Sequence, residues 1–263
     1  MKTLKCVAIL LTIFALTASV YSADKPLVLA QNGKSNFRIV ITANAPVIQK
    51  SAATELQSMF REMTGVELAI VETTASDPTI TSNSFVIGPS ELTKKLLGQT
   101  IDESKFGYDT LCIRRCGDSI VFTGHAKRGP LYAVNTFFED TLGCRWWTSK
   151  ESFIPKRPTL SVCDFDQTFT PKLIYRESYY RDAFNGPFAV KMRCNGASNR
   201  VADELGGHHA FQFFVHSFYP LIPPEKYYLT HPEWFSEIKG KRVVGRPGWS
   251  SISGPQKEFF SKL

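Results

Sequence analysis

Charged residues that could bind a ligand follow a short apolar run in the second half of the chain. The run KLIY is followed at once by Arg176 and Glu177, and Asp182 comes shortly after them. A guanidinium is planar and carries five N–H donors, so Arg176 suits bidentate hydrogen bonding to a carboxylate or to paired hydroxyls. The competing interpretation is an ion pair of Arg176 with Glu177 or Asp182 that ties down a loop. All three residues are therefore candidates for ligand binding, with loop stabilisation as the alternative.

A second candidate pair follows another apolar run. His216 comes directly after FQFFV, and Tyr219 stands close behind it. A neutral imidazole at a strand end can donate a hydrogen bond to a sugar hydroxyl or orient a carboxylate. The alternative is a histidine whose ring is satisfied by backbone groups. Because both runs are expected to be parallel strands, we predict that Arg176 and His216 line one pocket at a common sheet edge.

No pattern in the chain indicates a metal ion or a cofactor. His208 and His209 are adjacent, so in an extended segment their side chains point to opposite faces. The chain has no His-Glu-x-x-His motif and no paired cysteine doublets with zinc spacing. We therefore expect no cofactor and no metal site, and the sequence does not identify catalytic residues.

Residues 23 to 162 alternate short strands with helices, which is typical of an α+β domain. PLVLA and NFRIVIT are expected to pair around the turn QNGKS. The helix that follows places Leu56 and Phe60 at helical spacing and ends at Gly65, which suits a left-handed cap. We expect further strands at VELAIVE and SFVIGPS, a short helix at ELTKKLLG, and a hairpin in YDTLCIRRCGDSIVFTG.

The last helix of this domain is followed by an unusual amount of aromatic surface. Its sequence is RGPLYAVNTFFEDTLG, it ends at Gly143, and its apolar stripe consists of Leu131, Val134, Phe138 and Leu142. Trp146, Trp147 and Phe153 come next. We predict that these three side chains pack against the second part of the chain, because a fixed domain interface needs a large buried area. A platform on which sugar rings stack is the alternative.

The remainder of the chain is organised differently. Residues 163 to 171 are interpreted as a connector, because prolines surround a single strand-like stretch there. Residues 172 to 263 read as strand, helix, strand, helix, which is how a parallel α/β unit begins. GPFAVKMRCNG is expected to be a helix ended by Asn195 and Gly196. PPEKYYLTHPEWF holds two helix starts at Pro-Glu, and SEIKGKRV is expected to be a hairpin.

The first 22 residues resemble an export signal. Lys2 and Lys5 precede an apolar run, and small residues before Ala23 suit cleavage at that point. The run is too short to span a bilayer, so we expect a secreted or periplasmic protein without a membrane span. The formal net charge of +7 is mild, and the basic residues are scattered, which argues against a nucleic-acid partner.

Five cysteines remain after this signal, so at least one thiol is unpaired. They are Cys112, Cys116, Cys144, Cys163 and Cys194. We interpret most of them as small buried apolar residues, with a single disulfide as the alternative. The sequence does not indicate an oligomeric state.

Several segments resemble known exported proteins. GHAKRGPLYAVNTFFEDTLGCRWWTSKESFIP is similar to the end of the small α+β domain that precedes the barrel in glycoside hydrolases of the α-glucuronidase and β-hexosaminidase type. PKLIYRESYYRDAF, CNGASNR and FVHSFYPLIPPEKYYLTHPEWFSEIKGKR resemble bacterial exported proteins of domain of unknown function 4838. Together these words cover roughly residues 110 to 242.

The resemblance implies an α+β domain that leans on the start of a (β/α)8 barrel, which would be incomplete here. In hexosaminidase-type enzymes an arginine after the first barrel strand binds the sugar, so the resemblance gives Arg176 that role. A whole barrel takes about 250 residues, so the catalytic acids are expected to be missing. The tail after GKRV also departs from the family's pattern.

Three interpretations of function follow. The first is the front portion of a glycoside hydrolase-like protein acting on glycans that contain uronic acid or N-acetylhexosamine, inactive in this form. The second is a non-catalytic carbohydrate-binding or surface-interaction module. The third is an unrelated secreted α+β protein. The expected partner under the first two is carbohydrate.

Overall fold

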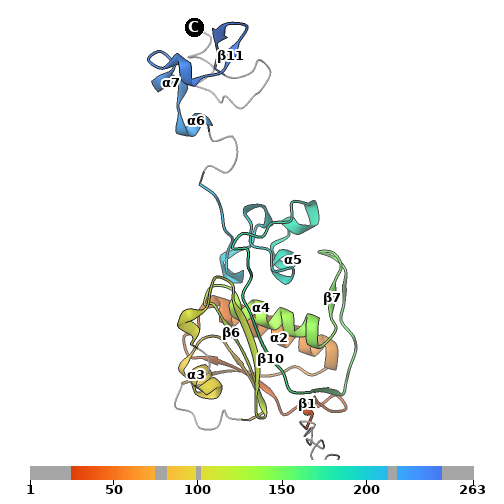
Figure 1. Cartoon of the computed structure of the whole chain (residues 1–263). Helices are drawn as coiled ribbons and strands as arrows, with labels where there is room; N and C mark the ends of the chain where they lie inside the picture. Colours follow the sequence, from red (N-terminus) through yellow and green to blue (C-terminus); the bar gives the residue numbers. More distant parts are fainter. Residues whose placement is uncertain (1–24, 75–81, 99–101, 213–217, 245–263) are drawn as a thin grey trace, which may run out of the picture. The chain divides into compact units, whose positions relative to one another are not determined.

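The computed structural model describes residues 25–74, 82–98, 102–212 and 218–244. Contacts within the chain divide it into two compact units, residues 1–209 and residues 210–263 (Figure 1). This division differs from the predicted boundaries at residues 162 and 171, since the segment up to His209 packs with the sheet. The expected signal, residues 1–22, lies outside the described residues.

The first unit is a mixed sheet with helices, which confirms the α+β class. Its strands are β1 (Leu27–Ala30), β2 (Arg38–Thr42), β3 (Ile70–Thr73), β4 (Ser84–Ile87), β5 (Leu111–Cys116), β6 (Ser119–Gly124), β7 (Arg145–Trp146), β8 (Ser152–Phe153), β9 (Leu160–Val162) and β10 (Asp166–Phe169). Its helices are α2 (Val47–Thr64), α3 (Glu91–Leu97), α4 (Gly129–Thr136) and α5 (Gly186–Lys191). Shorter helical turns are η3 (Glu103–Lys105), η4 (Phe137–Thr141), η5 (Arg181–Phe184), η6 (Ala197–Asn199) and η7 (Asp203–Leu205).

Six strands form the main sheet in the order β10-β5-β6-β4-β2-β3. The strands from β6 to β3 are parallel neighbours, and β5 and β10 are added antiparallel at the other side. Helix α2 makes the crossover that parallel β2 and β3 require, whereas β5 and β6 need only the two-residue turn at Gly117. The expected helix ending at Gly65 and the expected hairpin are both confirmed, and Gly65 is left-handed with φ of 81°.

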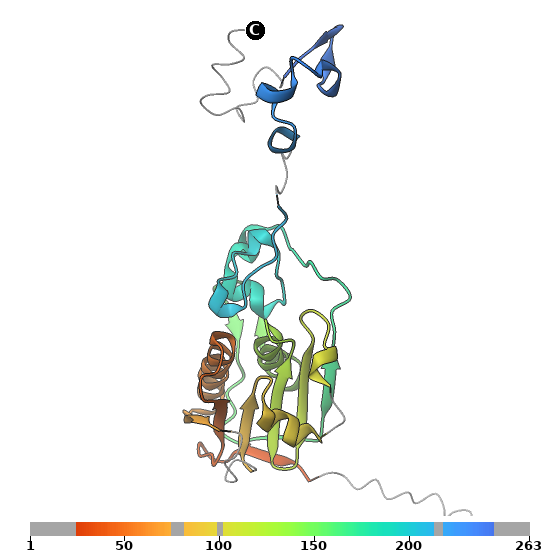
Figure 2. The same cartoon turned by 90° about the vertical axis from the view of Figure 1, so that its left-hand side faces the viewer.

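Helices lie on both faces of the main sheet (Figure 2), and alternation of side chains along each strand divides the core between these faces. Ile39 and Ile41 of β2 face α2 and α4, in the large cluster that also holds Phe85 and Phe122. The neighbouring residues along each of these strands face the opposite side of the sheet. Val40, Val86 and Val121 pack with Leu92 and Leu97 of α3.

The expected pairing of the first two strands is wrong. Strand β1 pairs with β9, with Leu27 opposite Val162, in a separate two-stranded sheet. Strand β2 already has parallel neighbours on both sides, β3 and β4, so it has no free edge for β1. The segment QNGKS still makes a tight turn, closed by a bridge between Gln31 and Lys34.

The helix before the two tryptophans ends where the sequence indicated, but the aromatic residues after it differ in burial. Helix α4 continues into the π-helical turn η4, and the chain leaves it at Gly143, whose φ is 78°. Trp146 is buried, and Lys191 of the second part lies over its ring at 5.5 Å, which confirms its interface role. Trp147 and Phe153 are 64% and 53% exposed, so the prediction that they are buried in an interface is wrong.

The strand expected at KLIY is absent. Residues 172–180 form neither strand nor helix, because the backbone around Arg176 bonds to Asn195 instead of a neighbouring strand. The segment expected to be a connector supplies β10, which pairs with β5. Helix α5 is present but ends at Lys191, before Asn195. No strand of a barrel occurs among the described residues after 171.

The described residues of the second unit form short elements only. They are α6 (Phe218–Leu221), α7 (Pro224–Tyr227), η8 (Pro232–Trp234), β11 (Glu237–Ile238) and β12 (Lys241–Arg242). Both Pro-started helical turns and the hairpin at residues 237–242 are confirmed. Tyr219 lies in α6, whereas His216 lies outside the described residues. Across the described residues, no helix has the length and apolar character that crossing a membrane requires.

The cysteines follow the first of the two interpretations. Cys112, Cys144 and Cys194 are buried, and none of the five cysteines forms a disulfide. Burial raises the pKa of Cys144 to about 11, so its thiol stays protonated at neutral pH.

Candidate functional site

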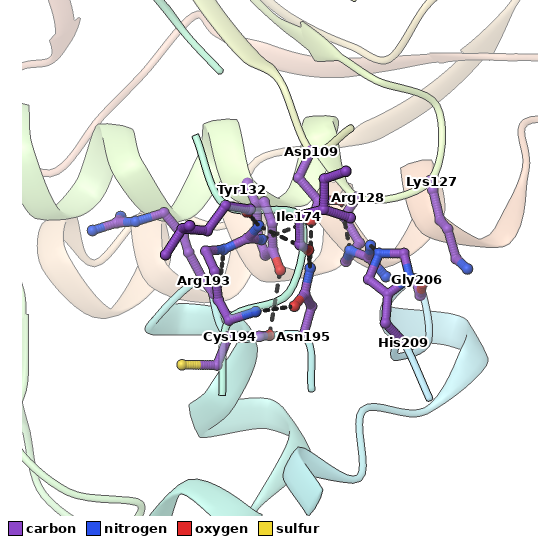
Figure 3. Close-up of polar contacts among 12 residues, drawn as sticks. Asp109, Lys127, Arg128, Tyr132, Ile174, Arg193, Cys194, Asn195, Gly206 and His209 are labelled. Carbon is purple, nitrogen blue, oxygen red and sulfur yellow. Dashed lines mark hydrogen bonds and ion pairs between the residues drawn. The ribbon is translucent and has the colours of Figure 1, made fainter. Parts of the chain in front are cut away.

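A buried network of charged side chains connects the sheet to residues 172–209 (Figure 3). Asp109 lies at its centre, in the turn before β5, with φ of 60° and no exposed surface. One carboxylate oxygen accepts from Arg128 Nε at 2.7 Å. The other accepts from Arg176 Nη2 at 2.6 Å and from the Asn195 amide at 2.8 Å. One carboxylate thus joins three side chains that are distant in sequence.

Arg128 is fully buried at the N-terminal end of α4. Besides its bond to Asp109, its Nη1 donates to the carbonyls of Gly206 and Gly207 at 3.0 and 2.9 Å. Its Nη2 lies 2.9 Å from His209 Nε2, and because a guanidinium only donates, this nitrogen is the acceptor. Arg128 therefore fastens the last residues of the first unit to the sheet.

Glycine at position 206 is required by this close approach. Its φ is 92°, and a Cβ there would lie 2.3 Å from Arg128 Cγ. Any larger residue would push the guanidinium away from its carbonyl acceptors.

Arg176 is tied in through most of its donors. Its Nε donates to the Arg193 carbonyl at 2.8 Å, and its Nη1 donates to the carbonyls of Leu173 and Ile174. The ion pair with Asp109 replaces the pairing with Glu177 or Asp182 that the sequence had suggested. The side chain retains 17% exposure, so one edge of the guanidinium still reaches solvent.

Glu177 and Asp182 hold separate segments. Glu177 accepts hydrogen bonds from Ser198, through backbone and hydroxyl, and from the Tyr175 hydroxyl at 2.8 Å. Asp182 accepts from the backbone and hydroxyl of Ser149, at 2.6 and 2.5 Å, and so fixes the turn of the β7–β8 hairpin. Neither carboxylate contacts the network around Asp109.

The electrostatics of the network favour fixed charges. Burial acts to raise the pKa of Asp109, but hydrogen bonds from Arg128 and Arg176 outweigh it and hold the pKa below its ordinary value. Burial and the neighbouring Arg128 lower the pKa of His209, so its ring favours the neutral form. Burial also raises the pKa of Tyr132 to about 12, and the Arg176 guanidinium lies over its ring at 5.9 Å.

These geometries position chain segments and do not transfer protons. Each oxygen of Asp109 is occupied by a cationic or amide donor, and its lowered pKa keeps it ionised. Among the described residues, no group of three or more histidine, cysteine or acidic side chains gathers as a metal site would require. The solvent-facing edge of the network consists of Arg176, His209 and Tyr108, whose ring lies 5.8 Å from that of His209.

The candidate residues from the sequence are only partly brought together. Arg176, Glu177 and Asp182 lie in the first unit, and only Arg176 belongs to the network. Tyr219 lies in the second unit, where burial raises its pKa, and His216 is outside the described residues.

Asp109, Arg128 and Asn195 were missed as site residues. The sequence feature that could have identified Arg128 was the Arg-Gly dipeptide at the start of α4. A Cβ on Gly129 would lie 2.4 Å from the Thr110 carbonyl, so the adjoining backbones also demand this glycine. Asp109 and Asn195 had no comparable signal.

Two of the solved structures that are similar to the chain are glycoside hydrolases. A family GH115 4-O-methyl-alpha-glucuronidase with specificity for decorated arabinogalactans matches with a TM-score of 0.50 and 14% identity, over 86% of this chain and 38% of the glucuronidase. A mutant beta-hexosaminidase of Streptomyces plicatus, in complex with its product GlcNAc, matches with a TM-score of 0.37 and 10% identity, over 58% of this chain and 25% of that one. At 14% identity the likeness to the glucuronidase concerns the fold alone.

The sequence comparisons place one family on the second half of the chain. No curated protein matches the chain. The family described as "Domain of unknown function (DUF4838)" matches residues 146–253. This match confirms the resemblance to that family over residues 146–253, and the fold of the chain is similar to part of the glucuronidase.

Proposed function

We propose that this chain is the glycan-recognising front portion of an exported glycoside hydrolase-like protein and that it hydrolyses no glycoside by itself. The observation that carries the proposal is the fold likeness to the glucuronidase, which covers 86% of this chain but 38% of that enzyme. The chain thus corresponds to a minor part of such a protein. In this proposal residues 1–22 direct export, and the part after residue 172 leads toward a (β/α)8 barrel.

Two carboxylates of the first unit, Glu177 and Asp109, support the lack of hydrolysis. A glycosidase needs a general acid whose pKa is raised, together with a second carboxylate at a set distance. Burial acts to raise the pKa of Glu177, but hydrogen bonds from Ser198 and Tyr175 outweigh it and lower the pKa, as the arginines do for Asp109. Both groups are thus held ionised, which is opposite to what a general acid needs.

Recognition without catalysis is supported by the exposed aromatic residues. Trp147 is 64% exposed on a hairpin whose turn is fixed by Asp182, and tryptophan is enriched at binding interfaces. An exposed, fixed aromatic ring is suited to stacking on a sugar. In this proposal Arg176 is a candidate sugar contact of the first unit. Tyr219 and His216 are separate candidates, which the sequence places in the second unit.

Two assays on purified residues 23–263 test the proposal. The first follows phenol release from aryl glucuronides and aryl N-acetylhexosaminides, and we expect none above the buffer rate. The second measures binding to a panel of immobilised neutral and acidic glycans, and we expect binding to at least one.

The controls separate weak activity from contamination. Turnover that disappears in Glu177→Gln or Asp182→Asn would contradict the proposed lack of hydrolysis. Turnover that both variants retain would point to a contaminating enzyme. A failure to bind any glycan would contradict the recognition role.

A further inference from the structure

The outer face of the β7–β8 hairpin carries two aromatic rings and a guanidinium. In the antiparallel pair, Arg145 lies opposite Phe153 and Trp146 lies opposite Ser152. Side chains alternate along a strand, so the burial of Trp146 turns Arg145 and Trp147 to the other face, where Phe153 joins them. Residues 145, 147 and 153 are all exposed, and together they form what we call the hairpin face.

Contacts of the hairpin backbone and of buried Trp146 hold the hairpin face in place. The Trp147 N–H donates to the Glu151 carbonyl at 3.0 Å, which continues the pairing by one step. Asp182 binds the backbone and hydroxyl of Ser149 at the turn, and buried Trp146 fixes the inner side. A rigid aromatic surface loses little entropy when it binds a ligand.

Arg145 is orientated with one edge free. Its Nη1 donates to the carbonyls of Glu139 and Cys144 at 2.7 and 2.6 Å, which fixes the plane of the guanidinium. Its Nε and Nη2 make no hydrogen bond to the described residues. This edge offers two parallel N–H donors, the arrangement that binds a carboxylate through both oxygens.

We propose that the hairpin face binds a uronic-acid-containing saccharide, an inference that rests on the proposed glycan recognition and names the class of sugar. One side of a pyranose ring presents C–H groups that pack on the negatively polarised face of an indole or a phenyl ring. Trp147 and Phe153 receive two such surfaces, and the Nε–Nη2 edge of Arg145 receives the carboxylate. Lys150 and Glu151 at the turn carry opposite charges, and Arg145 is the charged member of the hairpin face.

The test compares an acidic oligosaccharide with its neutral counterpart on the full chain. Isothermal titration with an oligogalacturonide and with its methyl ester keeps the rings and removes only the charge. We expect the acid to bind more tightly, by about three- to fivefold, the scale of a solvent-exposed charge pair. This preference should shrink as salt is added, because exposed charges are screened.

Surface variants assign the contacts. Trp147→Ala should weaken both ligands by about tenfold or more. Arg145→Ala should make acid and ester equal, and Arg145→Lys should restore only part of the difference, because an ammonium lacks the two-donor edge. Tyr179→Ala, an exposed aromatic residue outside the hairpin, and Lys95→Ala, which removes a charge on α3, should leave binding unchanged.

The outcomes distinguish this inference from the proposed function. Glycan binding that Trp147→Ala, Phe153→Ala and Arg145→Ala leave unaltered would overturn the hairpin face and preserve glycan recognition. Equal affinity of the wild type for acid and ester would overturn the uronic-acid assignment. Absence of binding to every glycan would overturn both.

Discussion

The two halves of the first unit are stabilised in different ways. The sheet half buries alternate apolar residues on both faces, so its stability is shared among many side chains. Residues 172–209 hold the short helix α5 and several helical turns, and their loops converge on the buried pair of Asp109 and Arg128. They also add five apolar residues to the main cluster, which are Phe188, Ala189, Val190, Cys194 and Val201. Shared apolar burial tolerates the loss of one contact, whereas a buried ion network depends on each of its members. The comparison predicts that the two halves respond differently to substitution.

The largest effect is expected from Asp109→Ala. The change leaves Arg128 and Arg176 buried without a counter-charge, which costs about 3–5 kcal/mol. Hydrogen exchange should show amides of residues 172–209 losing protection before those of the sheet, because stability differs between regions. Asp164→Ala removes an exposed carboxylate from the same unit as a control. Equal loss of protection in both halves would show that they unfold as one.

Leu56→Ala in α2 tests the sheet half. Leu56 is 1% exposed in the main cluster, so its truncation leaves a cavity and should cost about 2–5 kcal/mol. The free energy of unfolding in urea measures the loss. In contrast to Asp109→Ala, protection should fall throughout the first unit, since the core also supports the network. A loss confined to residues 172–209 would reverse the comparison.

A smaller effect is expected from Gly206→Ala. The new Cβ would meet Arg128 Cγ at 2.3 Å, in a left-handed backbone that disfavours side chains. The expected cost is about 1–3 kcal/mol, with faster exchange of residues 202–209. Gly33→Ala, also left-handed but with no atom within 4 Å of its Cβ, separates backbone strain from the clash. Equal costs for the two variants would remove the clash from the explanation.

The smallest effect concerns pH and His209. Its folded pKa is lowered by burial and Arg128, so the unfolded state binds the proton more readily. Stability from neutral His209 is therefore present above its unfolded pKa of about 6.5 and declines as the pH falls through the folded pKa. Urea unfolding between pH 7.5 and 5 should show this decline, and His209→Gln should reduce it. An unchanged slope in the variant would mean that His209 does not report on the network.

The sequence predicted those elements whose signal is local. The helix ending at Gly65 and the hairpin of β5 and β6 were correct, because periodicity and turn residues lie within each element. The pairing of β1 and the strand at KLIY were wrong, because an apolar run does not specify its neighbour. Strand β1 pairs with β9, which lies more than a hundred residues away in the sequence. KLIY lies in a loop in which the Ile174 carbonyl accepts a hydrogen bond from the Asn195 amide.

The candidate site shows the same limit. Arg176 was identified because a guanidinium after an apolar run is visible in the sequence, but its partner Asp109 was not. The two are 67 residues apart, and no spacing rule connects them. Trp146 and Trp147 were given the same role although alternation sends adjacent strand residues to opposite faces, which was the available signal.

By itself, the sequence determined the α+β class, most helix ends and the resemblance to DUF4838. These features depend on short-range patterns and on the order of short sequence motifs along the chain. Only the tertiary structure decided that residues 172–209 belong with the sheet, and that the family domain beginning at Trp146 extends across that unit's boundary. The physical reason is the burial of Arg128. A guanidinium removed from water requires acceptors, and the fold supplies them from two distant segments at once, the turn at Asp109 and residues 206–209.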